Sequence, residues 1–306
     1  MRAVVAVRHG GPEVLEMREV PEPQPAPGQV AIRVSSAGVN FSDLLSLRGT
    51  YAGPPPPFVP GIEVAGRTVD SDRPVIALLE SGGFGEVVVA DERMVLDAEG
   101  LDLGLAGGFG LVTLAAYFGL RRAARLQPGE DVLVTAAGGG LGTVAIQVAR
   151  ALGAGRVFGV ASTEDKRAVA RRAGADSTFG YDDELPAVDV VLDGVGGDAF
   201  ARAYRATRRF GRVVMVGSSS GEAPPIPGFQ ELRDRSVALA PFSFKALRTA
   251  DPELVRREAP AGIELIRSGR VDPVVGERLP LERAADALAR LGERRAVGKL
   301  VLEVRP

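Results

Sequence analysis

Apolar residues are spaced differently in different parts of the chain, and the clearest change of spacing lies at 131–153. Residues 132–135 form a short apolar run rich in β-branched side chains, which predicts a buried strand. A cluster of small residues follows. Apolar positions over 141–152 then recur with the period of a helix, until Gly153. The segment therefore predicts a strand, a glycine-rich turn and a helix.

The same alternation continues along the chain. Strand patterns lie at 156–161, 188–193 and 212–217, and helical patterns at 163–173 and 198–207. Strands that alternate with helices at this spacing favour parallel crossovers and a doubly wound sheet, whose ligands bind at the carboxyl ends of the strands. Small or polar residues follow the predicted strands at 162–163, 193–197 and 217–219.

The glycine-rich turn is a relative of the dinucleotide fingerprint. Ala136, Gly139 and Gly142 stand at intervals of three residues, but Thr143 occupies the place of a last glycine. Such a turn lets bare backbone amides and a helix N-terminus approach the pyrophosphate of a dinucleotide. A tight structural turn would have the same composition, so the pattern alone leaves both interpretations open. Its place in a strand–helix alternation favours dinucleotide binding.

The residues after the second of these strands bear on which dinucleotide is bound. A site for NAD usually has Asp or Glu there, about 20 residues beyond the glycines, to bind the ribose 2′-hydroxyl. Here the strand ends at Ser162, and Lys166 and Arg167 follow. A small polar residue followed by cations suits the 2′-phosphate of NADPH. The alternative is a set of solvated charges in a first helical turn, since Glu164 and Asp165 lie close by.

The N-terminal third has short strand-like segments in place of this alternation. They lie at 1–8, 14–20, 30–36, 61–69, 75–79 and 84–89, with room for one or two helical turns at 40–48 and a stiff proline loop at 54–57. Helical patterns at 107–124, 254–268 and 281–291 and a closing strand at 297–304 complete the chain. We expect the C-terminal part to rejoin the N-terminal, antiparallel β-rich unit. The dinucleotide-binding part is then an insertion, and the active site lies between the two.

Composition removes several classes of chemistry. The 306 residues include no cysteine and a single histidine, His9. A structural zinc site and a catalytic zinc site of the usual Cys/His kind are therefore excluded, so we expect no metal. Thiol mechanisms are excluded, and a Ser-His-Asp mechanism would need His9, which lies in a Gly-Gly-Pro turn.

Charge and hydropathy narrow the partners. Hydrophobic residues make up 45% of the chain and charged residues 25%, with a net charge of −2. This balance is typical of a globular protein and gives no reason to expect a nucleic acid or a membrane as partner. The sequence opens directly into a strand pattern without a signal-peptide core, and no apolar run is long enough to span a bilayer. We therefore expect a cytoplasmic enzyme.

Several motifs in order resemble one known family. They are HGGPEVL at 9–15, AGVNFSD at 37–43, VPGIE at 59–63, AAGGGLG at 136–142, VLDGVGG at 191–197 and VGKLVL at 297–302. On these motifs, nearly the whole chain resembles the zinc-independent quinone oxidoreductases (zeta-crystallin-like) of the medium-chain dehydrogenase/reductase superfamily. The resemblance implies an α/β fold: a Rossmann doubly wound parallel sheet (109–243) inserted into a GroES-like β-rich catalytic domain (1–108 and 244–306). It also implies a homodimer joined through sheet edges.

The resemblance also implies a set of site residues. Those that would border the cofactor are Thr113, Gly138, Gly139, Gly140, Leu141, Gly142, Ser162, Lys166, Tyr181, Gly194, Val195, Gly217, Ser218, Phe242, Ser243 and Phe244. Among them Lys166 would contact the 2′-phosphate and Thr113 the nicotinamide. Asn40 and Tyr51 would lie near the nicotinamide and the substrate as the catalytic residues. Each also has a plain structural interpretation, as a turn residue for Asn40 and as packing on the proline loop for Tyr51.

The implied reaction is hydride transfer from NADPH to a quinone or to the β-carbon of an α,β-unsaturated carbonyl, with Asn40 or Tyr51 donating a hydrogen bond to the carbonyl oxygen. The position of a second substrate aromatic holds Leu45, and the segment 66–76 is shorter than usual, which leaves the acceptor open. Two alternatives remain. One is an enoyl-thioester or alkenal double-bond reductase, and the other is an NADPH-binding protein with a structural or RNA-binding role.

Overall fold

The computed structural model describes residues 1–51 and 53–304 and divides the chain into two compact units. Unit 1 comprises Met1–Leu111, Asp251–Ala261 and Val275–Pro306, and unit 2 comprises Val112–Ala250 and Gly262–Val274. The chain thus leaves unit 1 after the first third of its length and returns to it for the C-terminal strands. No helix in the described ranges combines the length and apolar character that a membrane crossing needs.

Unit 2 is built on a six-stranded sheet in the order β10-β9-β8-β11-β12-β13, in which every neighbouring pair is parallel. The strands are β8 (Val132–Val134), β9 (Val157–Val160), β10 (Ser177–Phe179), β11 (Val188–Asp193), β12 (Thr207–Met215) and β13 (Ala238–Pro241). Because chain order reverses beside β8, the sheet has a switch point between β8 and β11, where such sheets bind ligands. The predicted doubly wound parallel sheet is confirmed.

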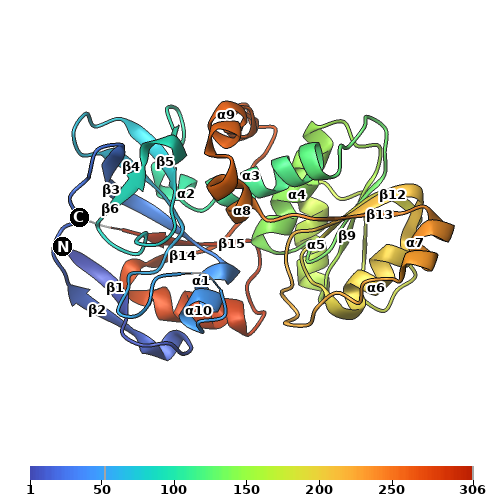
Figure 1. The fold of residues 1–306 in the computed structure, drawn as a ribbon, viewed down its shortest axis with the longest axis horizontal. Coiled ribbons are helices and arrows are strands. Elements are labelled where there is room, and N and C mark those ends of the chain that lie inside the picture. Colours follow the sequence, from blue (N-terminus) through green and yellow to red (C-terminus); the bar gives the residue numbers. More distant parts are fainter. Residues whose placement is uncertain (52, 305–306) are drawn as a thin grey trace. The chain divides into compact units, whose positions relative to one another are not determined.

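Helices precede, connect and follow these strands (Figure 1). They are α3 (Gly110–Phe118) with a π-turn at Gly119–Ala123, α4 (Gly140–Ala151), α5 (Glu164–Arg172), α6 (Gly197–Ala206), α7 (Phe229–Arg235) and α8 (Phe244–Ala250). The ring of Phe244 stacks on that of Phe118 with 5.5 Å between centroids. This contact places α8 in unit 2, whereas the domain boundaries expected from the sequence assign everything after 243 to the catalytic domain.

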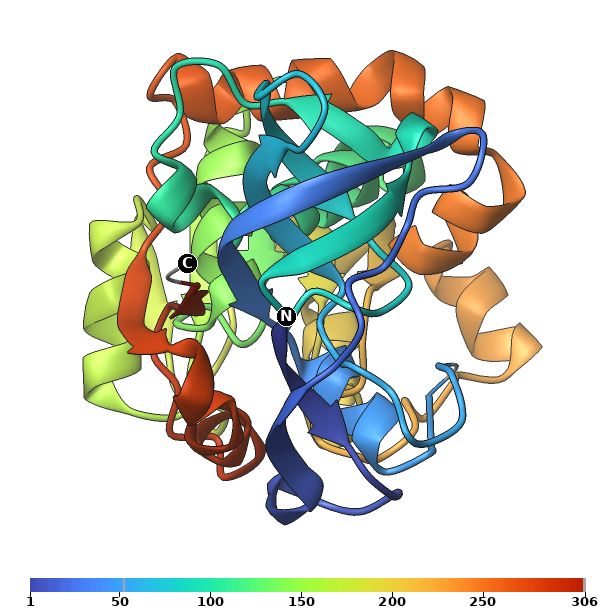
Figure 2. The same cartoon turned by 90° about the vertical axis from the view of Figure 1, so that its left-hand side faces the viewer.

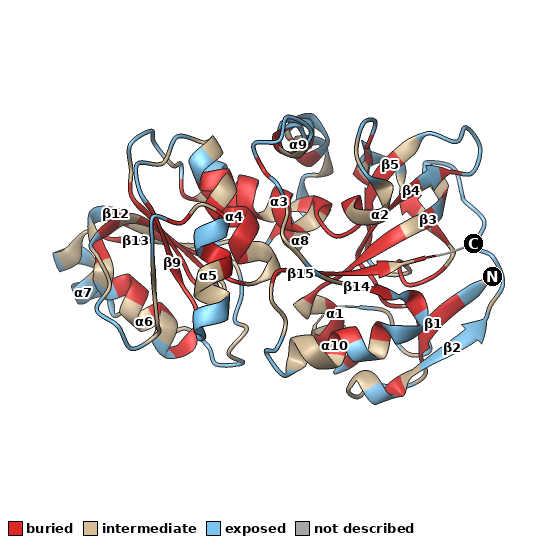
Figure 3. Cartoon of the chain, turned by 180° about the vertical axis from the view of Figure 1, so that it is seen from behind, coloured by how far each residue is buried: buried red, intermediate tan, exposed pale blue. Residues whose placement is uncertain are grey.

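Burial follows the apolar pattern of the sequence. Strand β9 is buried throughout, and α4 is buried along most of its length, whereas α5 has buried, intermediate and exposed residues (Figure 3). Acidic Glu164 and Asp165 stand in the first turn of α5 and basic Arg171 and Arg172 in its last, which matches the helix dipole at both ends. An amphipathic helix of this kind is stabilised by its inner face and by its termini.

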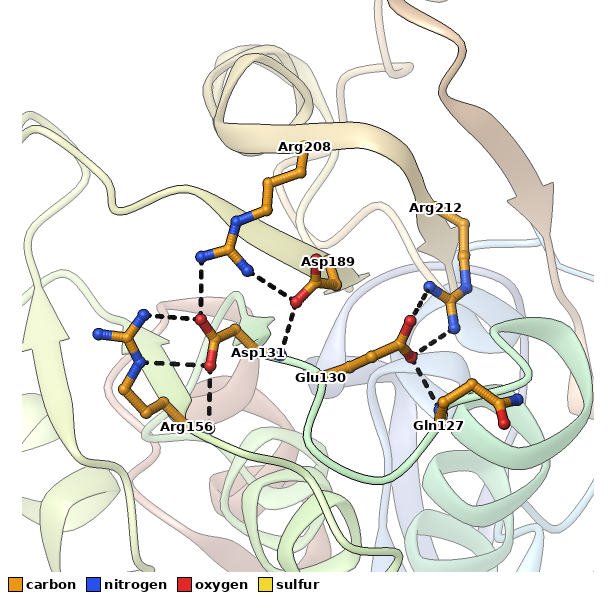
Figure 4. Close-up of polar contacts among 7 residues, drawn as sticks. All are labelled: Gln127, Glu130, Asp131, Arg156, Asp189, Arg208 and Arg212. Carbon is orange, nitrogen blue, oxygen red and sulfur yellow. Dashed lines mark hydrogen bonds and ion pairs between the residues drawn. The ribbon is translucent and has the colours of Figure 1, made fainter.

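An ion-pair network lies at the amino-terminal ends of the strands of this sheet (Figure 4). Asp131, just before β8, accepts from Arg156 at 2.7 Å and from Arg208 at 3.0 Å, and Arg208 also binds Asp189 of β11. Hydrogen bonds from Arg156 hold the pKa of the Asp131 carboxyl below its usual range. The network joins β8, β11 and β12 at the edge opposite to their carboxyl ends, so it supports the sheet without approaching the switch point.

Unit 1 is β-rich. Its seven-stranded sheet has the order β14-β15-β3-β4-β5-β7, with β6 also paired to β3. The strands are β3 (Gln29–Val39), β4 (Glu63–Thr68), β5 (Pro74–Leu78), β6 (Val87–Asp91), β7 (Val95–Asp97), β14 (Val275–Pro280) and β15 (Lys299–Glu303), and β1 (Arg2–Ala6) and β2 (Leu15–Glu19) form a separate hairpin. All pairs are antiparallel except β14 with β15.

The C-terminal strand completes this sheet. Strand β15 pairs with β3 in the register Leu300 to Val39, and Figure 2 shows the red C-terminal segment beside the blue N-terminal strands. The helices are α1 (Phe41–Leu47), α2 (Leu103–Ala106), α10 (Ala284–Gly292) and the first part of α9 (Pro252–Arg267), whose residues from Gly262 on belong to unit 2. Short 3-10 turns lie at Pro12–Val14, Glu92–Met94 and Leu281–Arg283. The core includes fully buried Ile32, Leu44 and Leu302. The β-rich character expected of this unit from the sequence is confirmed.

Candidate functional site

Two positions in the turn between β8 and α4 can hold only glycine. A Cβ at Gly142 would lie 2.3 Å from the carbonyl oxygen of Ala136, and one at Gly138 would lie 2.6 Å from the carbonyl oxygen of Lys166. Both distances are too short for any side chain. Gly139 is the residue before the first turn of α4, which Gly140 and Leu141 open, and it brings no side chain to cap that turn. The amides of the first turn of α4, which have no intrahelical partner and no capping side chain, are therefore the ones available to an anionic group.

Contacts to neighbouring strands fix the shape of the turn. The amide of Ala137 donates to the carbonyl of Val160 at 2.9 Å, and the amide of Ala136 donates to the hydroxyl of Tyr181 at 3.3 Å. Ala136 has φ of 49°, a left-handed conformation that costs a non-glycine residue free energy. Tyr181, expected at the adenosine end of a cofactor, thus lies against the glycine-rich turn.

The first turn of α5 packs beside the same turn. Thr163 caps α5 by accepting from the amide of Lys166 at 3.3 Å, and exposed Ser162 precedes it. The closeness of Lys166 to Gly138 involves backbone and Cβ atoms, so it does not depend on a side-chain rotamer. The structure therefore brings Gly138, Ser162 and Lys166 together at the carboxyl ends of β8 and β9.

A hydrogen-bonded pair joins the ends of β8 and β11. The hydroxyl of Thr135 donates to Asp193 at 2.6 Å and accepts from the amide of Gly194 at 3.0 Å. Asp193, which is fully buried, also accepts from the amides of Val195 and Gly196. These bonds shape the loop that holds the expected cofactor residues Gly194 and Val195. The sequence pattern did not identify Thr135, although a polar residue at the end of an apolar strand is a usable signal.

The remaining expected residues of unit 2 lie on the following strands. Gly217 and Ser218 come after β12, where a Cβ at Gly217 would be 3.3 Å from the carbonyl oxygen of Gly194. Phe242 follows β13, with its amide bonded to the carbonyl of Met215, and Ser243 accepts from the amide of Ala246 to cap α8. All of these segments leave the carboxyl edge of one sheet.

Thr113 differs from the others because it is inside the structure. It stands in α3, is fully buried, and its hydroxyl has no hydrogen-bond partner within the described ranges. A buried hydroxyl without a partner costs free energy. A ligand with a hydrogen-bonding group would satisfy it, as the amide of a nicotinamide can.

Unit 1 holds the other expected residues. Asn40 follows β3 and is buried. Its carboxamide nitrogen donates to Glu63 at 2.9 Å and to the carbonyl of Gly38 at 3.3 Å, and its oxygen accepts from Lys299 at 2.5 Å. Both N–H bonds of this amide are thus engaged inside the protein. Tyr51, by contrast, is half-buried in the loop after α1.

Asp43 completes this buried polar group. Its Oδ2 accepts from the amide of Asn40 at 2.8 Å, and its Oδ1 is buried without a partner among the described residues. Burial, more than any charge, raises the pKa of the Asp43 carboxyl to about 7. The sequence motifs around 37–43, 59–63 and 297–302 contain Asp43, Glu63 and Lys299, but nothing in the spacing indicated that they meet.

Comparison with known proteins identifies the family. Residues 26–78 match the alcohol dehydrogenase GroES-like domain, and residues 140–254 match the family described as zinc-binding dehydrogenase. The quinone oxidoreductase of Lama guanicoe is 31% identical, over 99% of this chain and 97% of its own length. The chain belongs to the quinone oxidoreductase-like proteins of the medium-chain dehydrogenase/reductase superfamily.

Two further relatives of this oxidoreductase are informative. The solved quinone oxidoreductase of Thermus thermophilus, also determined as its complex with NADPH, is 36% identical, with a TM-score of 0.87 over 99% of this chain and 100% of its own. The acryloyl-coenzyme A reductase of Metallosphaera sedula is 31% identical over 99% of both chains. The two relatives have different acceptors in their names, so family membership alone leaves the acceptor undecided.

The family description names zinc, but the composition of this chain does not provide the usual ligands for a zinc site. This oxidoreductase has no cysteine and one histidine, which are the side chains that usually hold a catalytic zinc. Within residues 1–51 and 53–304, no group of three or more His, Cys, Asp or Glu side chains is arranged to hold a metal ion.

Proposed function

We propose that the protein is an NADPH-dependent quinone oxidoreductase that transfers a hydride to a quinone or a related α,β-unsaturated carbonyl without a metal. The observation that carries this proposal is the approach of Lys166 to Gly138, which brings a lysine beside the glycine-rich turn at the sheet's switch point. A dinucleotide with its pyrophosphate on that turn would offer its 2′-phosphate to the residues that follow β9. The NADPH complex of the Thermus relative supports the same cofactor.

The residues present fit this cofactor at both ends. Gly138 and Gly142 leave room for a pyrophosphate, and the buried hydroxyl of Thr113 suits the carboxamide of a nicotinamide. When bound, NADPH supplies the hydride, and the protein's part is to bind, orient and exclude water. The acceptor gains that hydride and one proton, which solvent supplies, and becomes a hydroquinone or a saturated carbonyl.

We assign the hydrogen bond to the acceptor's carbonyl oxygen to Tyr51. Both amide hydrogens of Asn40 are already donated, to Glu63 and to the carbonyl of Gly38, which leaves Tyr51 as the other residue expected beside the acceptor. A donor aimed at an oxygen that becomes negative stabilises the transition state more than the ground state. Asn40 would then shape the site from behind.

Nicotinamide absorbance tests the proposal directly. The protein is mixed with NADPH, and separately with NADH, and the absorbance is followed while an ortho-quinone and then a simple alkyl enone are added. We expect oxidation of NADPH on addition of the quinone, faster than with NADH. Binding of NADPH without turnover of either acceptor would reject the assignment and favour a structural or RNA-binding role.

A double-bond reductase acting on an enoyl thioester is the second candidate, and the similarity to an acryloyl-coenzyme A reductase favours it. Acryloyl-coenzyme A added in the same assay separates the two, because it shares the electrophilic β-carbon but carries a long anionic arm. Faster turnover of the thioester than of the quinone would select this candidate.

The role of Lys166 leads to a prediction about cofactor preference. Lys166→Ala should raise the Kd for NADPH by about 10- to 100-fold, because a charge-assisted contact to the 2′-phosphate is lost, and leave the Kd for NADH nearly unchanged. Arg172→Ala, an exposed cation at the end of the same helix, is the matched control and should change neither. An equal rise in the Kd for NADPH and for NADH would show that Lys166 does not bind the 2′-phosphate.

We also propose a homodimer joined through the edge of the parallel sheet. Strand β13 lies at one edge of the sheet within the described residues. Phe210, on the neighbouring strand β12, and Phe229, on helix α7, are 77% and 78% exposed. Unpaired edges with large apolar side chains favour association. We expect light scattering to give twice the chain mass of 31.9 kDa.

Substitution of the two phenylalanines tests the position of this interface. The double variant Phe210→Ser/Phe229→Ser should shift the protein toward the monomer. Val69→Ser, at a residue that is 43% exposed in unit 1, is the control and should leave the mass unchanged. A double variant with the mass of the unaltered protein would place any interface elsewhere.

A further inference from the structure

A salt bridge between Glu63 and Lys299 lies wholly inside unit 1. The Glu63 side chain is 0% exposed and that of Lys299 is 3% exposed, with 2.7 Å between Oε1 and Nζ. The two residues begin β4 and β15, which flank β3 in the sheet. Burying two charges costs free energy that their attraction returns only in part, and apolar residues of similar volume often stabilise a core as well. Stability alone therefore does not account for the pair.

The pair holds the carboxamide of Asn40 at both ends. Lys299 donates to the Asn40 oxygen at 2.5 Å, and Glu63 Oε1 accepts from the Asn40 nitrogen at 2.9 Å. Because Lys299 also donates to Glu63, the three groups close a ring of hydrogen bonds. Rotation of the Asn40 side chain would break at least two of these bonds at once, so the ring selects one rotamer.

The second oxygen of Glu63 holds a helix. Oε2 accepts from the amide of Leu111 at 2.9 Å, in the first turn of α3, where helix amides have no intrahelical partner. A carboxylate at this end is also favoured by the helix dipole. Thr113, with its unpartnered buried hydroxyl, stands two residues further along the same helix.

The chain leaves space for this carboxylate. A Cβ at Gly38 would lie 2.3 Å from Glu63 Oε1 and 2.6 Å from the carbonyl oxygen of Gly107, so only glycine allows the approach. One carboxylate therefore contacts the two segments that carry Asn40 and Thr113.

We propose that Glu63 and Lys299 are positioning residues for hydride transfer, because their buried ion pair fixes the Asn40 carboxamide and the first turn of α3, the helix that carries Thr113. This inference rests on the proposed function for its catalytic consequence. Neither residue would contact the reacting atoms. Their effect passes through the placement of Asn40 and Thr113.

The variant Glu63→Gln tests the proposal. A carboxamide has a single acceptor oxygen, so either the Leu111 amide or the Lys299 and Asn40 donors lose their acceptor. We expect kcat with NADPH and a quinone to fall by about 100-fold, while the Kd for NADPH changes by less than about threefold, because misplacement by a fraction of an ångström affects the transition state most. The double variant Glu63→Gln/Lys299→Met should lose no more than the single one, since the pair acts as a unit.

A control separates positioning from simple loss of stability. Ile32→Val removes one methyl group from the same core without touching the ion pair. It should lower the melting temperature and leave kcat within about twofold. A Glu63→Gln enzyme with the kcat of the unaltered protein would overturn the proposal.

Hydrogen exchange tests the positioning without any acceptor. The backbone amides of Asn40 and Leu111 should exchange at least about tenfold faster in Glu63→Gln than in the unaltered protein, with smaller changes in unit 2 strands. If the unaltered protein reduces no quinone or enone, the proposed function fails, and faster exchange still supports the positioning of the two segments. Unchanged exchange at both amides would overturn the inference whether or not the protein is a quinone reductase.

Discussion

Gly142→Ala should abolish NADPH binding at ordinary concentrations while the protein still folds. The added Cβ would lie 2.3 Å from the carbonyl oxygen of Ala136 and 2.7 Å from Cα of Ala137. Both are backbone atoms of the turn, so the turn itself must move, and its amides move with it. A displacement of about 1 Å in a preorganised site costs about 100-fold, and we expect the Kd for NADPH to rise by at least that factor. The quenching or shift of NADPH fluorescence on titration measures this Kd.

A second glycine serves as the matched control. Gly228 precedes α7 with φ of −66°, and a Cβ there would meet nothing within 4 Å. Gly228→Ala should therefore leave the Kd for NADPH unchanged. Far-UV circular dichroism should give the same helix and strand content for both variants, with the Gly142 variant melting at a lower temperature because overpacking costs about 1–3 kcal/mol. A Gly142→Ala protein that binds NADPH within a few-fold of the unaltered Kd would show that the turn does not hold the pyrophosphate.

The glycine-rich turn could be found from sequence because its signals are local. Three patterns follow one another in the chain: the apolar run of β8, the small residues of the turn and the helical period of α4. Each pattern indicates a local backbone conformation. The neighbouring strands β9 and β11 have the same local signals. The handedness of parallel crossovers then restricts the topologies that these elements can form, so the doubly wound class of fold can also be predicted from the sequence.

Short strands of mixed polarity were missed for the opposite reason. β10 (Ser177–Phe179) and β13 (Ala238–Pro241) are brief, and β14 (Val275–Pro280) has Glu277 and Arg278 between its apolar residues. Each lies at an end of its sheet and pairs with one neighbour, β9, β12 or β15. Their pairing comes from tertiary context, which overrides weak local propensity. The assignment of α8 differs for the same reason, because the contact of Phe244 with Phe118 joins residues far apart in sequence.

The buried polar group of unit 1 shows the same limit for the site. Asn40, Glu63 and Lys299 each stand in a motif that the sequence made visible, yet Lys299 contacts the other two from positions 236 and 259 residues away in the chain. No periodicity encodes such a contact. Asn40 considered alone suggests a hydrogen-bond donor to substrate, whereas its surroundings show a carboxamide whose hydrogens are already used.

Asp43 makes the stability of this unit depend on pH. Its carboxyl is buried beside two charged groups, Lys299 and Glu63, and burial is the main cause that raises its pKa from 3.8 to about 7. Between these two values the folded protein keeps a proton that the unfolded chain has released. Stability contributed by this group is therefore complete below about pH 3.8, falls as the pH rises, and is lost above about pH 7.

Asp43→Asn should remove that dependence. Asparagine keeps an acceptor for the Asn40 amide but does not titrate. The free energy of unfolding of the variant, relative to that of the unaltered protein, should therefore rise by up to about 4 kcal/mol from pH 4 to pH 7.5. This figure follows from the shift in the pKa at about 1.4 kcal/mol per pKa unit. Urea unfolding at several pH values measures it, and other titrating groups cancel in the difference. Below about pH 3.8 the difference in free energy of unfolding between the two proteins should not change with pH, which is the internal control. A difference that stays constant across the whole range would show that Asp43 is already ionised in the folded protein at acid pH, and that the cluster carries a net negative charge.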